Sequence, residues 1–342
     1  MSGHPYNKKN ILFVSFYLIL LCILIETCSR SYYSIKNSLS FFSSPEDLIF
    51  IWYPELKKLN KYEYRTGSYN ILFLGGSVLV KGWGNVPDYI YKLSSDFDKK
   101  VNFVNLAASA HSSLDSYYKY QWIRKKRFDV VLFYHGINEV RTNNVPSKKW
   151  KNDYSHYSWY DEVNFYFRHP FLKKTGLLTP YFLKHTLIQL ETKIVNKNQF
   201  IPTNSPKDEW LEYGNDVKTS ESFRANLIKI IEIAKKRKET LIIPTFAYSR
   251  FYPAYYKLFP EKEKVGYIWI WGKPKNVVLG INVHNTIIRQ LTRKGGFIFL
   301  DQEKLMRNND LYFRDVCHFT DEGSKFFVET ILKKMTSLDN KL

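Results

Sequence analysis

The sequence predicts an α/β fold in which a doubly wound parallel sheet of five strands carries helices on both faces. Short and almost uninterrupted apolar runs, such as residues 129–134, are typical of strands that are covered on both sides. These runs alternate five times with segments of helical pattern, which favours a parallel sheet with right-handed crossovers. The expected architecture is therefore a three-layer α/β/α sandwich of the flavodoxin-like type.

The expected elements run from residue 69 to the C-terminus. The helix expected at 223–236 is amphipathic, as a helix that covers a sheet must be. Thr320 is expected to be the N-cap of the last helix. Strands are expected at 70–74, 101–106, 129–134, 240–245 and 297–300, and helices at 86–97, 114–124, 223–236, 283–294 and 321–335.

Composition bounds the class of protein. The chain has 342 residues, of which 44% are hydrophobic, and this suits a globular core. The three cysteines, Cys22, Cys28 and Cys317, form neither a disulfide framework nor a CxxC metal pattern. The net charge is +19, but the two densest basic runs, 124–127 and 235–238, each end an expected helix, where the backbone dipole favours cations. We therefore expect helix ends there and no nucleic-acid partner, with general attraction to an anionic membrane surface as the alternative.

An apolar segment near the N-terminus predicts a membrane anchor. Residues 11–25 form an apolar run that follows Lys8 and Lys9. Extended to residue 28, the run reaches the lower end of what a helix needs to cross about 30 Å of hydrocarbon. A cleaved signal peptide has a similar basic start and apolar centre, but Glu26 stands where small residues of a cleavage site are needed. We expect an uncleaved anchor, with a signal peptide and a buried helix of a soluble protein as alternatives.

The anchor sets the expected organisation of the chain. Flanking charges favour, by a small margin, an N-terminus inside the cell, with the body of the protein outside the cytoplasm, periplasmic or extracellular. The expected parts are a cytoplasmic segment at 1–10, the anchor at 11–28, a juxtamembrane linker at 29–68 and one domain at 69–342.

Two insertions interrupt the alternation of strands and helices, at about 141–219 and 248–275. Both are rich in Tyr, Trp and Phe and show no strong period. Insertions of this length are usually functional or form an extra subdomain. Their aromatic side chains are expected either to form a small core for the insertions, or to bind a sugar or acyl chain or touch the bilayer interface.

Side chains suited to acyl-ester chemistry follow the expected strands. Ser77 follows the first strand and two glycines, where a nucleophile would be accessible at a strand end. Asp315 and His318 are three residues apart, and residues so spaced on a helical turn share a face. Such an Asp can fix the tautomer of His318 and stabilise the imidazolium that forms when it takes the proton of Ser77. Gly-Gly-Ser is also a common turn, and a lone His is often a plain surface residue.

An oxyanion hole is expected beside Ser77. Asn138 stands just past the third strand, where its side-chain amide can reach a developing oxyanion. The backbone N–H groups of Ser77 and Ala110 are the other expected donors. An Asn in a turn such as Gly-Ile-Asn-Glu is by itself ordinary turn chemistry.

The chain resembles the SGNH (GDSL-like) hydrolase family from about residue 69 to the C-terminal helix, and the resemblance rests on four segments, at 74–77, 105–110, 136–139 and 315–318. In that family a Ser, a Gly, an Asn and a His of four blocks carry catalysis. The resemblance implies that Ser77 is the nucleophile, Asn138 an oxyanion donor and Asp315 with His318 the rest of a catalytic triad. Residues 319–323 also look like the family's sequence after the catalytic His, and the N-terminal anchor is similar to that of membrane-bound bacterial members.

The chain departs from the family pattern at four positions. Gly76 replaces the GDSL aspartate, which does no chemistry, and Glu139 replaces the commoner Asp beside the catalytic Asn. In the second block, Ala107 and Ala110 stand where glycines are usual. The N–H of Ala110 can serve as donor if its φ is negative, whereas a positive φ would strain an alanine.

The expected function is that of a membrane-anchored serine hydrolase that acts on acyl esters of glycans or lipids through an acyl-Ser77 intermediate. No metal and no organic cofactor are expected. One alternative is a glycan O-acetyltransferase that uses the same triad, with a membrane protein as acyl donor. A second alternative is a non-catalytic carbohydrate-binding protein on an SGNH scaffold, suggested by the lost glycines of the second block.

Overall fold

The computed structural model describes residues 8–94, 100–195, 216–250 and 271–339. The chain forms two compact units. One unit comprises residues 1–54 and 158–200, and the other comprises 55–157 and 201–342. Residues 158–200, which lie inside the first expected insertion, thus cluster with the N-terminal part of the chain.

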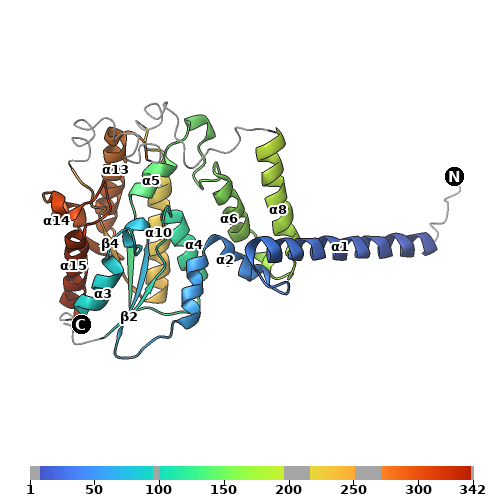
Figure 1. The fold of residues 1–342 in the computed structure, drawn as a ribbon, viewed down its shortest axis with the longest axis horizontal. Coiled ribbons are helices and arrows are strands. Elements are labelled where there is room, and N and C mark those ends of the chain that lie inside the picture. The colour runs from blue at the N-terminus through green and yellow to red at the C-terminus, as the bar shows by residue number, and fades with distance from the viewer. Residues whose placement is uncertain (1–7, 95–99, 196–215, 251–270, 340–342) are drawn as a thin grey trace. The chain divides into compact units, whose positions relative to one another are not determined.

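The larger unit is built on a parallel sheet of five strands in the order β2-β1-β3-β4-β5 (Figure 1). This is the flavodoxin-like order, and it confirms the predicted fold. Each strand overlaps one of the five apolar runs that predicted it, and β1 extends one residue beyond its run at each end. The strands are β1 (Tyr69–Gly75), β2 (Val101–Asn105), β3 (Val130–Tyr134), β4 (Thr240–Pro244) and β5 (Ile298–Leu300).

Helices cover both faces of this sheet. Helices α3 (Val86–Leu93) and α15 (Asp321–Asp339) pack against each other on one face. Helices α4 (Ser113–Trp122), α10 (Thr219–Arg237) and α13 (Pro274–Thr292) pack together on the other. The shorter elements of this unit are η3 (Ser77–Leu79), α5 (Ile137–Thr142), η5 (Ser147–Lys149), α14 (Gln302–Met306) and η8 (Asp310–Tyr312).

Local signals explain where two of these helices begin. The side chain of Thr320 accepts a hydrogen bond from the N–H of Gly323 at 3.1 Å, so Thr320 is the N-cap of α15 as predicted. Helix α13 begins at Pro274, nine residues before the expected start, because proline is pre-organised for the first turn of a helix. Val277 and Ile281, which lie ahead of the expected start, are fully buried in the core.

The register of the sheet brings the ends of β1 and β3 to the same level. Gly75, the last residue of β1, pairs with Tyr134, the last residue of β3. The segment after β2 is attached to the same place, because the N–H of Ala108 donates to the carbonyl oxygen of Gly75 at 3.2 Å. Ligands of doubly wound sheets bind beyond these carboxyl ends.

The smaller unit is helical. Helix α1 (Lys8–Asn37) is the one helix among the described residues that is long and apolar enough to cross a membrane, with a mean hydropathy of 2.5 over 18 residues. The helix extends past residue 28, into the segment expected to be a linker. The other elements of this unit are η1 (Pro45–Leu48), α2 (Ile49–Trp52), α6 (Ser158–Arg168), α7 (Pro170–Lys173), α8 (Thr179–Leu190) and the π-helical turn η6 (Glu191–Val195), and η2 (Pro54–Lys61) runs across the boundary between the units.

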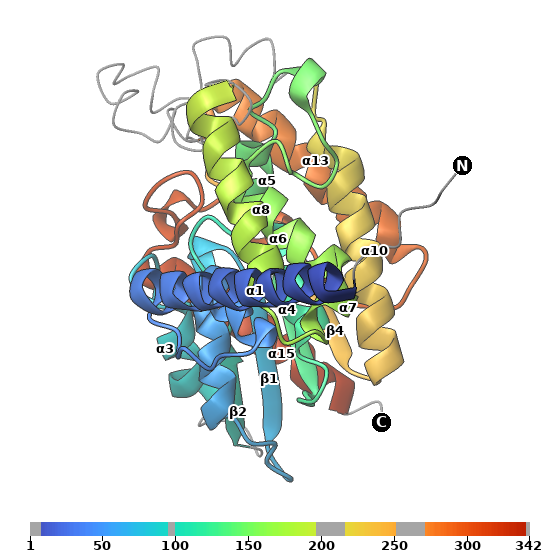
Figure 2. The ribbon, with the colours of Figure 1, turned by 90° about the vertical axis from the view of Figure 1, so that its right-hand side faces the viewer.

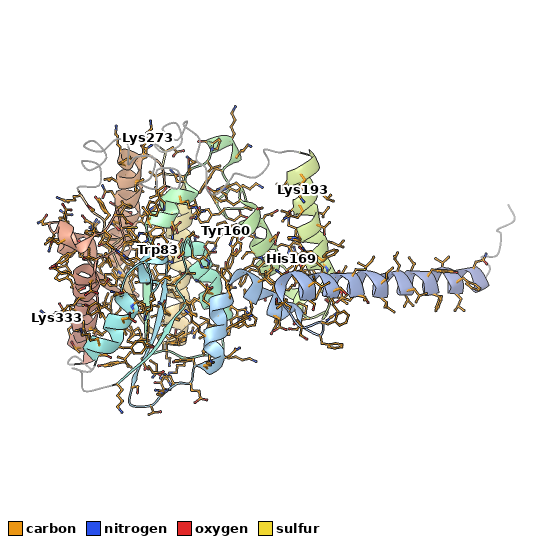
Figure 3. The ribbon with its side chains drawn as sticks, in the orientation of Figure 1. Trp83, Tyr160, His169, Lys193, Lys273 and Lys333 are labelled. Atoms are coloured by element: carbon orange, nitrogen blue, oxygen red, sulfur yellow. The ribbon has the colours of Figure 1, made fainter. Side chains whose placement is uncertain are left out.

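Aromatic side chains of the first insertion form part of a core. The ring of Tyr166 lies 5.1 Å from that of Trp52, and Tyr160 and Tyr181 are also buried. The insertion is therefore helical where the sequence shows no strong period, since its helices are stabilised by tertiary packing. Residues 196–215 of this insertion and 251–270 of the second lie outside the described residues. Figure 3 shows the side chains of both units in the orientation of Figure 1.

Candidate active site

The predicted nucleophile lies directly beyond β1. Gly76 and the one-turn helix η3 carry the chain away from the strand, and Ser77 is the first residue of that turn. Its side chain is buried, with 6% of the residue exposed. The Ser77 Oγ atom lies 2.8 Å from Nε2 of His318, at hydrogen-bond distance. The first and the last of the four sequence segments are thus brought together across 241 residues of chain.

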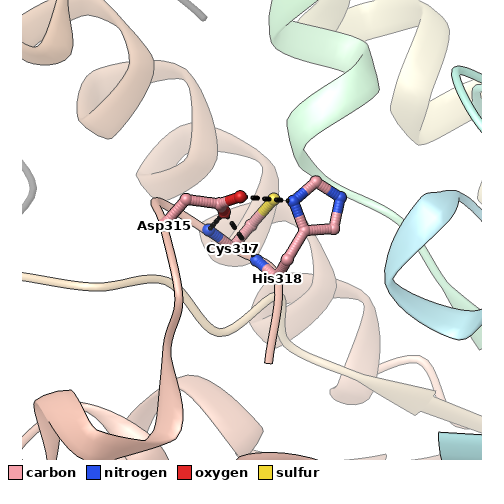
Figure 4. A group of neighbouring side chains, drawn as sticks. All are labelled: Asp315, Cys317 and His318. Carbon is pink, nitrogen blue, oxygen red and sulfur yellow. Dashed lines mark hydrogen bonds and ion pairs between the residues drawn. The ribbon is translucent and has the colours of Figure 1, made fainter. Parts of the chain in front are cut away.

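His318 is held by a tight loop that precedes α15. Phe313 and Phe319 form an antiparallel bridge that closes the loop, and the N–H of Arg314 donates to the carbonyl oxygen of His318 at 2.8 Å. Asp315 lies inside this loop. Its Oδ2 atom is 2.7 Å from Nδ1 of His318, as Figure 4 shows. Ser77, His318 and Asp315 therefore form one continuous line of hydrogen bonds.

The environment of Asp315 keeps its carboxyl group ionised. Burial by itself would raise the pKa of Asp315, but the hydrogen bond from His318 and the N–H groups of Cys317 and His318 outweigh burial and lower it. Both N–H groups donate to Oδ1, at 2.9 and 2.8 Å. A charged Asp315 facing Nδ1 favours the tautomer that carries its proton there, which leaves Nε2 free to accept the proton of Ser77.

Asp315, Cys317 and His318 also offer three potential metal ligands within 4.8 Å of one another. Metal ligation needs a thiolate and a free imidazole nitrogen. Burial raises the pKa of the Cys317 thiol well above its ordinary value, and Nδ1 of His318 already faces Asp315. The chemistry of this group therefore fits a hydrogen-bonded pair better than a metal centre.

Two tryptophans flank the imidazole of His318. The ring of Trp83 stacks on it with centroids 4.5 Å apart and an interplanar angle of 24°, and the ring of Trp271 lies at 6.1 Å. Trp271 is buried, whereas Trp83 is 37% exposed. The guanidinium of Arg314 donates to the carbonyl oxygen of Trp83 and so ties the two loops together. The sequence does not predict these contacts, because no motif or spacing relates Trp83 to His318.

Asn138 lies in the first turn of α5, beyond β3. Its side-chain Nδ2 donates to the carbonyl oxygen of His111, the residue after Ala110, at 2.8 Å. The same atom lies close to Gly76: a Cβ atom on Gly76 would be 2.6 Å from it. Any side chain at position 76 would therefore press on the amide of Asn138. This close approach accounts for a glycine immediately before Ser77.

Ala110 has a positive φ of 65°. The left-handed conformation costs an L-residue about 1–2 kcal/mol. The strain expected for an alanine with a positive φ is therefore present in this turn. Among the described residues, neither the N–H of Ala110 nor that of Ser77 has a hydrogen-bond acceptor. Both remain available as donors, as an oxyanion hole requires.

Replacing Ala110 with glycine is expected to raise the free energy of unfolding by up to about 1 kcal/mol, because relief of the left-handed strain exceeds the entropy that glycine adds to the unfolded chain. Urea unfolding measures the change. Ala107→Gly is the matched control, since Ala107 lies in the same segment without a positive φ, and it is expected to destabilise by about 0.4–1 kcal/mol. Equal losses of stability in both variants would contradict the strained turn.

A cluster of buried charged and polar side chains stabilises the second segment, residues 105–110. Lys119 of α4 is fully buried, and its Nζ donates to the carbonyl oxygen of Leu106 at 2.6 Å, to Glu55 Oε1 at 3.0 Å and to His111 Nδ1 at 3.0 Å. Burial, together with the charge of Lys119, lowers the pKa of His111 to about 4, so this imidazole is neutral and accepts. The cluster positions Leu106 and His111 at the two ends of the segment that carries Ala110.

Glu139 is the buried neighbour of Asn138. Its carboxyl group accepts hydrogen bonds from the hydroxyl of Tyr154 at 2.5 Å and from the N–H of Ser113. Burial raises the pKa of Glu139 to about 7, against the opposing effect of these hydrogen bonds. Glu139 thus fixes the first turn of α5 to the start of α4 and holds Asn138 in place.

The fold and the site define a three-layer α/β protein whose sheet edge carries a Ser–His–Asp line beside candidate oxyanion donors. No protein-family model matches the sequence, and no curated protein matches it. Solved structures that are similar to this chain are GDSL-like lipases, acylhydrolases and acetyl xylan esterases.

Three of them illustrate the similarity. A putative acylhydrolase from Bacteroides fragilis is 12% identical, with a TM-score of 0.45 over 84% of this chain and 95% of that chain. A GDSL-like lipase from Bacteroides thetaiotaomicron is 12% identical, with a TM-score of 0.43 over 84% and 98%. An acetylxylan esterase from Geobacillus stearothermophilus is 11% identical, with a TM-score of 0.43 over 79% and 96%.

Proposed function

We propose that the protein is a membrane-anchored serine esterase that cleaves acyl esters through an acyl-Ser77 intermediate. The observation that carries the proposal is the line of hydrogen bonds from Ser77 Oγ through the imidazole of His318 to the carboxylate of Asp315. A nucleophile, a base and an orienting carboxylate in this geometry suit acyl transfer. The proposal is supported by the position of all three at the carboxyl edge of the sheet, where such folds bind ligands.

The reaction proceeds in two halves. Ser77 Oγ attacks the ester carbonyl carbon while Nε2 of His318 takes its proton, and the imidazolium is stabilised by Asp315. The tetrahedral intermediate collapses when His318 returns the proton to the leaving alcohol, and the acyl group stays on Ser77. Water then attacks the acyl-enzyme with the help of His318, which releases the carboxylic acid and restores the Ser77 hydroxyl.

The oxyanion of each tetrahedral intermediate is held by the backbone N–H groups of Ser77 and Ala110 and by the amide of Asn138. The Asn138 NH₂ group has two hydrogens, and one of them donates to the carbonyl oxygen of His111. The bond to His111 orients the amide so that its second N–H is left for the substrate. Donors that are aligned before the reaction contribute most to stabilising the transition state.

The substrate class is an acylated glycan. Trp83 presents a partly exposed indole next to the imidazole of His318, and flat aromatic faces suit the apolar faces of sugar rings. A glycan O-acetyltransferase would use the same acyl-enzyme, with a sugar hydroxyl in place of water. Helix α1 supports the membrane anchor, since no residue of its apolar window is buried. The charges that flank the anchor favour an extracytoplasmic larger unit. No metal or cofactor takes part.

The full-length protein in detergent tests the proposal. With p-nitrophenyl acetate we expect a burst of p-nitrophenol and covalent labelling by a fluorophosphonate probe, and both are lost in Ser77→Ala. Ser147→Ala is the control, because Ser147 is an exposed serine of the same unit. Acylated sugar formed on addition of oligosaccharides would indicate transfer, and no p-nitrophenol release together with no labelling would refute both enzyme activities.

A further inference from the structure

Helix α8 has an apolar stripe on its outer face. Leu183, Leu187 and Leu190 are 50%, 56% and 43% exposed. Their spacing of four and three residues places them on one side of the helix. An exposed apolar face on a helix marks a contact with another protein or with a membrane surface.

The opposite side of α8 faces its own unit. Tyr181 and Ile188 are buried there. Lys184 forms an ion pair with Asp161 of α6 at 2.8 Å, and His185 forms one with Glu162 of α6 at 2.8 Å. The leucine stripe therefore points away from α6, and no described residue of the chain covers it.

The start of α8 is hydrogen-bonded to α1 at the residue where the apolar run of α1 ends. Glu26 accepts hydrogen bonds from the N–H groups of Leu178 and Thr179, both at 3.0 Å, and from the hydroxyl of Thr179 at 2.7 Å. Arg30 bonds to Glu26 at 2.7 Å and to the carbonyl oxygen of Gly176 at 2.8 Å. The level at which α1 changes from apolar to polar is thus also the level at which α8 begins.

Helix α8 runs across α1 rather than along it, in Figure 1 and also in the turned view of Figure 2. Helix α1 continues without a break from Lys8 to Asn37. The part of α1 that contacts α8 therefore has the same direction as the part that crosses the bilayer. When α1 crosses a bilayer, a helix that runs across α1 at this level lies along the bilayer surface.

Because the apolar run of α1 is short, the residues at its end are drawn toward the lipid. Residues 11–25 span only about 22 Å as a helix, whereas the hydrocarbon core is about 30 Å thick. A short apolar run is accommodated by local thinning of the bilayer and by bringing flanking residues into the interface. Leu177, which is 45% exposed beside the residues bound by Glu26, adds a further apolar side chain at this level.

We propose that the Leu183–Leu187–Leu190 face of α8 lies in the interface of the bilayer that α1 crosses, so that the smaller unit rests on the lipid surface. This proposal depends on the membrane anchor and not on the chemistry of Ser77. The partner is the lipid surface itself, because the stripe is attached to the anchor at the membrane boundary.

The test uses the full chain with Cys22 and Cys28 replaced by Ser, and with Cys317 left in place because it is buried. Single cysteines at Leu12, Leu187 or Gln189 are labelled with the fluorophore NBD, and each protein is reconstituted in phosphatidylcholine–phosphatidylglycerol vesicles. Gln189 is the matched control: it is exposed on the same helix but about 100° or more from the leucine stripe.

We expect labels at 12 and 187 to be quenched by nitroxide-bearing lipids and shielded from iodide, and the label at 189 to be quenched at least two-fold less by the lipids. Lipid quenching at 12 without quenching at 187 would overturn the proposal and leave the anchor intact. Absence of lipid quenching at both positions would refute the anchor as well. Shielding of 187 from iodide without lipid quenching would indicate contact with a second protein copy and would also overturn the proposal.

Discussion

Replacing Asp315 with asparagine is expected to lower kcat for ester hydrolysis by about 10⁴-fold, the size of loss that follows when the orienting carboxylate of a Ser–His–Asp triad becomes an amide. In the native protein Oδ2 faces Nδ1 of His318, and Oδ1 accepts two backbone N–H groups. An asparagine whose oxygen keeps the backbone bonds turns its NH₂ toward Nδ1. His318 then carries its proton on Nε2 and cannot accept the proton of Ser77.

Steady-state hydrolysis of p-nitrophenyl acetate measures this effect, and thermal unfolding checks that the variant is folded. Asp310→Asn is the control, since Asp310 is an exposed residue at the start of the same loop region, and its activity is expected to be unchanged. A loss below ten-fold in Asp315→Asn would mean that His318 is oriented by another group.

The same carboxyl group predicts an acid limit to stability. Because the folded protein lowers the pKa of Asp315, the folded state binds this proton more weakly than the unfolded state does. Its contribution to stability is present above the unfolded pKa and is lost as the pH falls through the folded pKa. Urea unfolding between pH 6 and pH 3 is expected to show a smaller acid loss in Asp315→Asn than in the native chain.

Replacing Gly76 with alanine is expected to lower kcat by about 10²–10³-fold, as the loss of one oxyanion donor does in serine enzymes. The added Cβ atom would lie 2.6 Å from Nδ2 of Asn138 and must displace that amide. The backbone at Gly76 has a φ of −91°, which alanine adopts without strain. The effect is therefore on the amide of Asn138 and not on the turn.

A double-mutant cycle isolates this mechanism. Asn138→Ala is expected to lose about as much activity as Gly76→Ala, and the double variant to lose little more than either, because both substitutions remove the same donor. Additive losses, with the double variant about 10⁴-fold or more below the native rate, would show that position 76 acts on catalysis by a route other than Asn138.

Local patterns were sufficient to predict the framework of the site. Apolar runs mark buried strands, so the ends of β1 and β3 could be located, and with them the positions of Ser77 and Asn138. The spacing of Asp315 and His318 predicted a pair that faces one another. In the structure the pair is held by a closed loop and not by a regular helix, but the three-residue spacing brings the same two side chains together.

The parts that could not be predicted depend on contacts between distant segments. Trp83 and Trp271 contact His318 from two distant segments of the chain, and no local pattern relates them. From the sequence, Lys119 would be taken for an ordinary exposed residue of a helix. It is fully buried in the structure, because Glu55 and the carbonyl oxygen of Leu106 accept hydrogen bonds from its ammonium group. The sign of φ at Ala110 depends on the path of the whole turn, which a single residue type does not determine.

The shared level of the ends of β1 and β3 has a consequence for how the chain tolerates additions. Ser77 and Asn138 each follow one of two directly paired strands, so their separation is set by the ladder between Gly75 and Tyr134. The long insertion begins only after Asn138, and the cost of closing a loop grows slowly with its length. A lengthened, shortened or exchanged segment between residues 158 and 195 leaves that ladder intact. The candidate site is in this sense modular: the spacing of Ser77 and Asn138 is fixed within the sheet, while the inserted segment can vary.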